Sequence, residues 1–162
     1  MNCPHCNTEN RPSAKFCDQC ANPVNASVDP APNGADKRGP LDGIKVLDWT
    51  MWQFGPVSTM MLGDLGADVI KVESLDGDHG RQFRRVAGAV SQLPGGLNAY
   101  FESLNRQKRS IALDLKNPKG VERLDRLVAQ SDVFVQNFRQ GVAERLGMGD
   151  DDLIKHNPKL IY

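Results

Sequence analysis

Residues 39–73 constrain the fold of this chain more than any other segment. Two short runs rich in β-branched residues, 44–47 and 69–72, are separated by apolar residues at helical spacing. Those apolar residues are Val57, Met60, Met61 and Leu65. The pattern predicts strand, helix and strand, and a right-handed crossover makes the two strands parallel. Ligands of such sheets bind where the carboxyl ends of the strands meet the helix starts, so we expect a site at residues 48–55.

The turn after the first strand lacks the fingerprint of a dinucleotide site. Residues 49–56 read Trp-Thr-Met-Trp-Gln-Phe-Gly-Pro, where that fingerprint would place Gly-x-Gly-x-x-Gly. Gly55 permits the turn, and Pro56 suits a first helical position because its missing N–H would have no partner there. Gln53 immediately precedes the helix and can direct its amide at a ligand.

All four cysteines form two Cys-x2-Cys pairs, Cys3 with Cys6 and Cys17 with Cys20. Four thiolates complete the tetrahedral shell of Zn²⁺ and leave no open position for water, as in structural sites. Disulfides are the alternative, but nothing in the sequence indicates an oxidising compartment. The pattern predicts a small zinc ribbon that needs its metal to fold.

The chain is predicted to contain a zinc ribbon at residues 1–22, a flexible linker at 23–39 and a larger domain at 40–162. The linker is rich in Pro, Asn, Ala and Ser and has almost no large apolar side chain. It therefore buries too little apolar surface to offset the conformational entropy that ordering would cost. The larger domain alternates strands and helices, which predicts an α/β fold: a Rossmann-like parallel sheet with flanking helices.

The second half of that domain repeats the alternation. Residues 110–114 predict a strand, and Asn117-Pro118 opens a helix whose apolar stripe belongs to the core. Residues 133–135 predict the next strand, and residues 136–139 follow at its carboxyl end. The connection at 74–97 is long for a compact domain, which is typical of functional lids or disordered segments.

Six pieces of the sequence follow, in order, the pattern of one known family. They are PLDGIKVLD, QFGP, LGDLGADVIKVE, GDHGR, LNRQKRSIALDLK and VQNFRQGVAERLG. From residue 39 onward the chain resembles the amino-terminal part of the class III CoA-transferases, a family that includes formyl-CoA and carnitine-CoA transferases and α-methylacyl-CoA racemase. A zinc ribbon is not a usual part of this family.

The resemblance implies a set of CoA-binding residues. It places Gln53 beside the thioester at the catalytic centre. The residues implied to contact CoA or line its path are Arg81, Asn105, Lys108, Asn137, Phe138 and Arg145. Ser74 and Leu75 stand where relatives often place an arginine or proline that helps to hold the nucleotide.

The implied function is that of an acyl-CoA:carboxylate CoA-transferase, which moves CoA between carboxylic acids through an aspartyl-CoA thioester. The family's nucleophilic aspartate lies beyond this chain, whose last residues begin a strand. We therefore expect a truncated piece that is inactive alone. The alternatives are an acyl-CoA racemase of the same family and a non-catalytic zinc-binding interaction module on a CoA-transferase-like scaffold.

The expected partners are acyl-CoA, an acceptor acid, a second copy in an interlocked homodimer, and a protein partner for the ribbon. Lys and Arg total 20, as do Asp and Glu, so no global charge favours nucleic acid or an anionic membrane. No apolar run approaches the ~20 residues of a transmembrane helix, and the first residues are unlike a signal peptide. We expect a cytoplasmic protein.

Overall fold

The computed structural model describes residues 2, 9 and 39–162. The chain divides into two units, residues 1–37 and 38–162. In the first unit, Asn2 and Glu9 form an antiparallel bridge. The predicted zinc ligands Cys3, Cys6, Cys17 and Cys20 lie outside the described residues.

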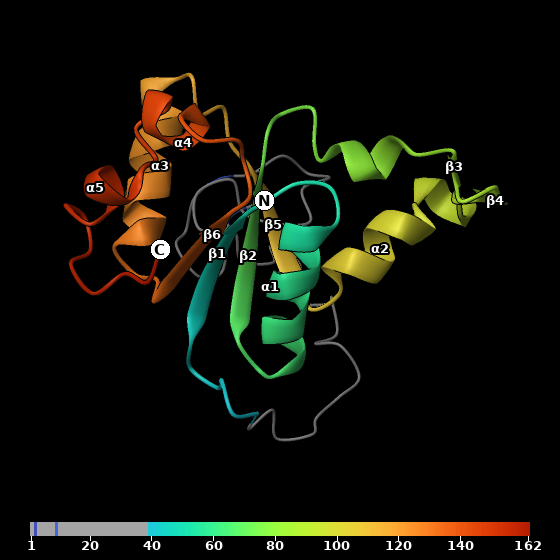
Figure 1. Cartoon of the computed structure of the whole chain (residues 1–162), viewed down its shortest axis with the longest axis horizontal. Coiled ribbons are helices and arrows are strands. Elements are labelled where there is room, and N and C mark those ends of the chain that lie inside the picture. Colours follow the sequence, from blue (N-terminus) through green and yellow to red (C-terminus); the bar gives the residue numbers. More distant parts are fainter. Residues whose placement is uncertain (1, 3–8, 10–38) are drawn as a thin grey trace. The chain divides into compact units, whose positions relative to one another are not determined.

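A four-stranded parallel sheet forms the centre of the second unit (Figure 1). Its strands are β1 (Lys45–Trp49), β2 (Asp68–Glu73), β5 (Lys108–Ala112) and β6 (Val133–Gln136). The strand order is β5-β2-β1-β6, and β1 pairs in parallel with both β2 and β6. The predicted parallel strand-helix-strand unit is confirmed.

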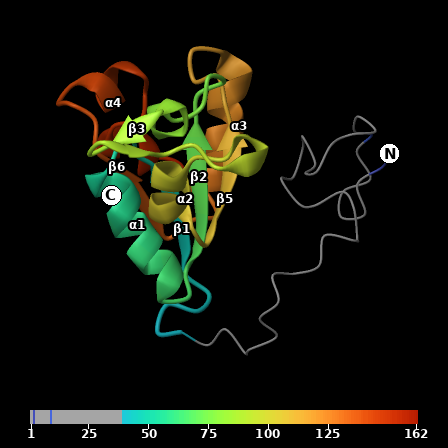
Figure 2. The ribbon, with the colours of Figure 1, turned by 90° about the vertical axis from the view of Figure 1, so that its right-hand side faces the viewer.

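Helices cover both faces of this sheet. Helix α1 (Phe54–Asp64) lies on one side and α3 (Pro118–Val128) on the other (Figure 2). The shorter helices are α2 (Ala99–Asn105), α4 (Val142–Arg145) and α5 (Asp150–Leu153). Asn117 caps α3 as its sequence predicts, because its side chain accepts the N–H of Lys119 over 3.0 Å. No helix in the described part of the chain is both long and apolar enough to cross a bilayer.

The α3 face of the sheet carries the larger apolar core. Leu47, Val72 and Phe134 project from three strands into a cluster that includes Leu124 and Val128 of α3. Successive residues of a strand point to opposite faces, so the neighbours of these residues face α1.

The α1 face changes from apolar to charged along the strands. Near the start of their strands, Val46 and Val69 are buried in a small apolar cluster. Two residues further on in each strand stand Asp48 and Lys71, which are also buried. The carboxyl end of this face therefore holds charged groups in a position where a stable fold alone would favour apolar ones.

Helix α1 buries small residues together with Met60, one of the four apolar residues at helical spacing. Its buried residues are Gly55, Pro56, Thr59 and Met60, whereas Met61 and Leu65 are 57% and 46% exposed. Small side chains are needed on the buried face because the first turn packs directly against the loop that follows β1.

Residues 74–97 also differ from a structureless connection. They contain two 3-10 turns, η1 (His79–Gln82) and η2 (Pro94–Gly96), and a hairpin of β3 (Arg85–Val86) and β4 (Ala89–Val90). Asp78 caps η1 by accepting the N–H of Gly80, which orders the start of the segment.

Candidate functional site

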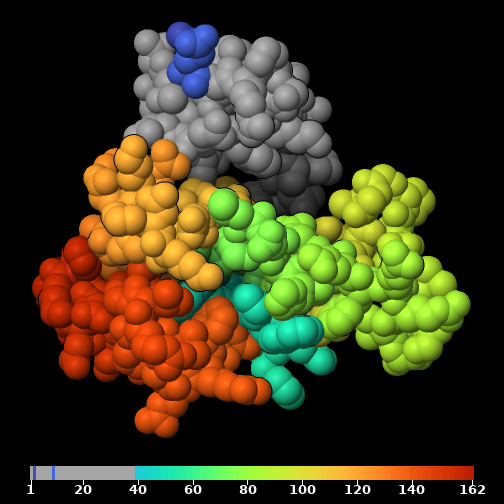
Figure 3. Space-filling model, turned by 90° about the horizontal axis from the view of Figure 1, so that it is seen from above, coloured from blue at the N-terminus to red at the C-terminus, as the bar shows by residue number. Residues whose placement is uncertain are grey.

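The loop between β1 and α1 lies at the carboxyl end of the sheet. Viewed from that end, it lies between the segment 74–97 and the segment that contains α4 (Figure 3). Trp52 in this loop has a φ of 73°, a left-handed conformation that bulky residues rarely adopt. Asn137, which follows β6, binds the preceding residue twice: Met51 N–H donates to its Oδ1 over 2.9 Å, and its Nδ2 donates to Met51 O over 2.8 Å. These bonds hold a strained turn in one position.

Gly55 allows α1 to begin against this loop. A Cβ at residue 55 would lie 2.4 Å from Thr50 Cβ and 2.9 Å from Asn137 Cγ, closer than side-chain atoms approach. The glycine that the sequence places before Pro56 is therefore required by the packing of loop, helix and strand end.

Four buried charges lie beneath the loop, and we call them the buried charge cluster: Asp48, Lys71, Asp78 and Lys108. Lys71 Nζ lies 2.9 Å from Asp78 Oδ2, and Lys108 Nζ lies 2.8 Å from Asp48 Oδ2. Both lysine side chains are 1% exposed. Each buried cation thus faces a buried anion, as burial of charge requires.

Lys108 has an acceptor for each of its three N–H bonds. Besides Asp48, they are Pro56 O at 2.8 Å and Asn105 Oδ1 at 2.9 Å. Burial lowers the pKa of the Lys108 ammonium, and the charge of Asp48 opposes that effect. The Lys108 side chain therefore serves acceptors inside the protein.

Asp48 and Lys71 connect the cluster to the loop. Asp48 Oδ1 accepts the backbone N–H of Thr50 over 3.0 Å and also the Thr50 hydroxyl, while Oδ2 accepts the hydroxyl of Thr59 over 2.7 Å. Lys71 Nζ donates to Thr50 O over 2.8 Å. The polar atoms of Thr50 are thus bound to charged groups from two adjacent strands.

Glu73 at the end of β2 forms a second charged group with Arg81. Arg81 donates through Nε to Oε2 over 2.8 Å and through Nη2 to Oε1 over 2.7 Å, and its guanidinium stacks on Phe101. Burial raises the pKa of the Glu73 carboxyl, but hydrogen bonds from Arg81, Ser110 and the Asp78 N–H, with the charge of Arg81, lower it to about 2. Glu73 in turn raises the pKa of Arg81.

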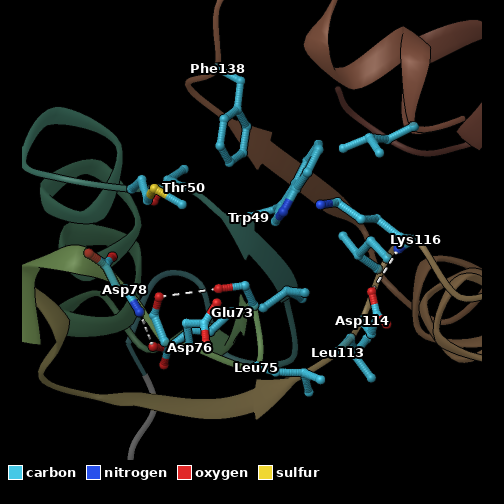
Figure 4. Close-up of a pocket in the computed structure, with 16 residues that line it drawn as sticks. Trp49, Thr50, Glu73, Leu75, Asp76, Asp78, Leu113, Asp114, Lys116 and Phe138 are labelled. Atoms are coloured by element: carbon cyan, nitrogen blue, oxygen red, sulfur yellow. Dashed lines mark hydrogen bonds between the residues drawn. The ribbon is translucent and has the colours of Figure 1, made fainter.

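A cavity of about 470 Å³ opens at the carboxyl ends of β1, β2, β5 and β6. The rings of Trp49 and Phe138, with centroids 4.4 Å apart, lie on one side of it, and Glu73 and Asp78 lie on another (Figure 4). Its other lining residues are Thr50, Met51, Val72, Ser74, Leu75, Asp76, Gly77, Leu113, Asp114, Leu115, Lys116 and Leu146. An aromatic wall opposite polar groups suits a ligand with both a flat ring and polar substituents.

A smaller cavity of about 170 Å³ lies beside the Glu73–Arg81 pair. It is lined by Lys71, Arg81, Phe101, Glu102, Asn105, Lys108 and Ser110. The three cations on this list are paired with Asp78, Glu73 and Asp48. The cavity therefore has little uncompensated positive charge for an added anion.

The structure brings five of the seven sequence-predicted residues into two groups. Phe138 lines the larger cavity, and Asn137 next to it holds the loop that carries Gln53. Arg81, Asn105 and Lys108 line the smaller cavity. Gln53 is exposed at the start of α1 and its side chain makes no capping hydrogen bond, while Arg145 is exposed on α4. Ligand contact by each of them stays a prediction.

Sequence reasoning missed residues 113–116, which line the larger cavity after β5. The rule that pointed to 48–55 and 136–139 applies equally to this third strand end and would have found them. Residues 74–78 line the cavity too, and they include Gly77 and Asp78 of the GDHGR piece.

Among residues 2, 9 and 39–162, no three His, Cys, Asp or Glu side chains are arranged to hold a metal ion. Residues 2–24 match the family model of the zinc-ribbon domain, which covers all four cysteines.

Residues 41–162 match the family model named CoA-transferase family III. The chain is 46% identical over 122 residues to the formyl-CoA:oxalate CoA-transferase of Afipia carboxidovorans, covering 75% of this chain and 27% of that protein. It is 43% identical over 124 residues to human succinyl-CoA:glutarate CoA-transferase, covering 76% of this chain and 27% of that protein. The chain thus spans less than a third of the length of these relatives.

Solved structures give the same match. The orthorhombic form of Rv3272 from Mycobacterium tuberculosis aligns with a TM-score of 0.66 at 40% identity, covering 76% of this chain and 31% of that one. A CAIB/BAIF family protein from Brucella suis aligns with a TM-score of 0.66 at 42% identity, covering 76% and 32%.

Proposed function

Because the chain belongs to CoA-transferase family III, we propose that residues 40–162 form the CoA-binding portion of an acyl-CoA:carboxylate CoA-transferase. The names of the relatives pair a CoA thioester with a carboxylic acid, which supports this reaction class. The observation that carries the proposal is the cavity of about 470 Å³ at the four strand ends. Its volume falls within the roughly 300–1,000 Å³ of small-molecule sites.

The lining of the larger cavity suits the nucleotide end of CoA. Trp49 and Phe138 offer aromatic faces for the adenine ring, and Lys116 is the one cation among the described residues that line the cavity. We assign Lys116 to a phosphate group. Arg145 on α4 follows the same strand end as Phe138 and is exposed, so it can add a second contact to phosphate.

Gln53 is proposed to lie by the thioester. Gln53 is exposed and its side chain makes no capping hydrogen bond, so its amide can hydrogen-bond the thioester carbonyl. The oxygen and the nitrogen of the Asn137 side-chain amide are both bound to Met51, so its proposed contact with CoA is through the neighbouring backbone. Asn105, Lys108 and Arg81 are proposed to support the pantetheine path from the smaller cavity.

The proposed reaction of the whole protein exchanges one acyl partner of CoA for another. An aspartate oxygen attacks the thioester carbonyl carbon, the C–S bond breaks, and CoA leaves as thiolate. The thiolate then attacks the aspartyl carbonyl of the mixed anhydride, which releases the first acid and forms aspartyl-CoA. The acceptor carboxylate attacks aspartyl-CoA and again releases thiolate, which attacks the acceptor carbonyl of the new anhydride and frees the aspartate. Division into such steps lowers each barrier, and exclusion of water protects the activated acyl group. We assign no aspartate of this chain to that role.

For the predicted ribbon of residues 1–22, we propose that Cys3, Cys6, Cys17 and Cys20 hold one structural Zn²⁺. The proposed assembly of the whole protein is an interlocked homodimer, with the ribbon left to contact another protein.

The test is calorimetric titration of CoA into the 162-residue chain. We expect saturable binding, and dissociation constants about tenfold larger for Phe138→Ala and for Lys116→Met. Arg109→Met is the matched control, because Arg109 forms an ion pair with Asp68 in which both side chains are exposed, so its loss should leave binding unchanged. We expect no CoA exchange between acids by this chain alone. Failure of the unsubstituted chain to bind CoA would refute the proposal.

A further inference from the structure

The loop that carries Gln53 is held at both ends by lysines of the buried charge cluster. Lys71 Nζ donates to Thr50 O and Lys108 Nζ donates to Pro56 O, each over 2.8 Å. Residues 50 and 56 delimit the loop and the first helical turn, so the two ammonium groups fix the backbone on either side of Gln53. They come from β2 and β5, the two strands of the sheet that lie beyond β1 on one side.

Stability alone does not explain these lysines. Burial of an ion pair costs desolvation free energy, and apolar residues of similar size often stabilise a fold as well or better. An apolar residue cannot, however, donate a hydrogen bond to a backbone carbonyl. Lys71 Nζ lies 2.9 Å from Asp78 and Lys108 Nζ lies 2.8 Å from Asp48, and these ion pairs allow the two donors to be held in a dry site.

The cluster is also poorly suited to bind an anion. Its two cations face two anions, and Lys108 has an acceptor for every N–H. A phosphate or carboxylate would have to displace Asp48 or Asn105. The hydrogen bonds of the cluster therefore point to the loop as the structure that it serves.

We infer that Lys71 and Lys108 are positioning residues that hold the loop of residues 50–56 so that Gln53 meets its ligand in a preset geometry. This inference rests on the proposed function for the identity of that ligand, a CoA thioester. The strained φ of Trp52 persists only while its surroundings fix the loop, and two buried cations below with Asn137 at the side supply that constraint.

Paired substitutions test the inference without leaving a buried charge unpartnered. The first variant combines Lys71→Met with Asp78→Asn, since asparagine retains an oxygen to cap η1. The second combines Lys108→Met with Asp48→Asn, which retains an oxygen for Thr50. The matched control combines Arg109→Met with Asp68→Asn and removes an exposed pair between the same two strands, β5 and β2.

The readout is amide hydrogen exchange in the 162-residue chain without ligand. We expect exchange at Met51 and at Val57, whose N–H donates to Gln53 O, to accelerate about tenfold or more in both cluster variants, and exchange at Leu47 and Val69 to change less than about twofold. The control should leave all four amides unchanged. The two tryptophans give two indole N–H resonances, and the Trp52 signal should shift, because its ring packs on His79.

Unchanged exchange in the loop would overturn the inference, and so would equal acceleration in the strands, which would mean that the cluster stabilises the whole fold. Titration of CoA then separates this inference from the proposed function. If the unsubstituted chain binds CoA, both cluster variants should bind about tenfold more weakly. If the unsubstituted chain does not bind CoA, the proposed function fails, while the exchange data still decide whether the lysines position the loop.

Discussion

Asn137 connects two parts of the site through a single side chain. Its side chain accepts from Met51 N–H and donates to Met51 O. Asn137 thus makes the two hydrogen bonds to Met51 that a neighbouring strand would otherwise make. Asn137→Ala removes both bonds, and we expect the free energy of unfolding to fall by about 1–2 kcal/mol. Urea denaturation measures the change, with Gln140→Ala at an exposed position nearby as the control. An equal effect of both substitutions would contradict the assigned role of Asn137.

Glu73 gives the fold a defined response to acid. Its pKa falls from 4.5 in the unfolded chain to about 2 in the folded one. The stabilisation is therefore fully present above pH 4.5 and is lost as the pH falls through 2. The shift corresponds to roughly 3 kcal/mol of stability.

We expect Glu73→Gln to flatten the pH dependence of unfolding between about 4.5 and 2, as measured by denaturation at several pH values. Arg81→Met should reduce the same dependence in part, because it removes two of the hydrogen bonds that lower the Glu73 pKa. A Glu73→Gln variant that keeps the full acid dependence would show that another group is responsible.

At the level of single residues, the strand-end rule selected Gln53 and Asn137, and the structure brings both into one local structure around the loop. Their roles in binding a ligand stay predictions. The buried position of Lys71 could not be predicted from its strand pattern, because its partner Asp78 comes from a turn seven residues later. A lysine is buried only where the tertiary structure supplies its acceptors, and these cannot be identified from the local sequence.

At the level of elements, the first turn of α1 requires glycine at position 55, because the loop leaves no space for a side chain there. Gly55→Ala would place a Cβ 2.4 Å from Thr50 Cβ, so the loop or the helix must move. We expect a loss of about 1–3 kcal/mol in the free energy of unfolding and weaker CoA binding. Gly63→Ala on the same helix is the control, since its Cβ would lie 3.2 Å from Gln107 Cβ and helix propensity would rise.

The control should change stability by less than about 1 kcal/mol in the same urea denaturation. If Gly55→Ala were as mild as Gly63→Ala, the loop would have space that the structure does not show.

The elements themselves were largely predictable, because strands and helices follow local periodicity. The four strands and α3, with its Asn117 cap, lie within a few residues of their predicted positions. In α1, Gly55 and Thr59 are buried beside Met60, while Met61 and Leu65 are largely exposed, so the spacing of apolar residues does not by itself define the buried face. The hairpin in 74–97 was missed because two-residue strands carry too little pattern.

For the molecule as a whole, we expect the proposed zinc ribbon and CoA-binding portion to act independently. The connecting segment is rich in Pro and small polar residues, which transmit little structural change. The purified chain should contain one Zn²⁺ per molecule by elemental analysis. Removal of zinc with a chelator should leave the dissociation constant for CoA unchanged within about twofold. A parallel loss of zinc and CoA binding would show that the two parts are coupled.

Pairing between β1 and β6 has a consequence for how the chain folds. Strands β1 and β2 are neighbours in sequence, whereas Lys45 N–H binds the carboxylate of Asp132, 87 residues away. Contacts of such separation require closure of a long loop, which slows their formation. Since Asn137 reaches Met51 only after β6 has docked, the loop that carries Gln53 should become ordered in the final kinetic phase of folding. Competence to bind a ligand would then be a late event that reports complete folding.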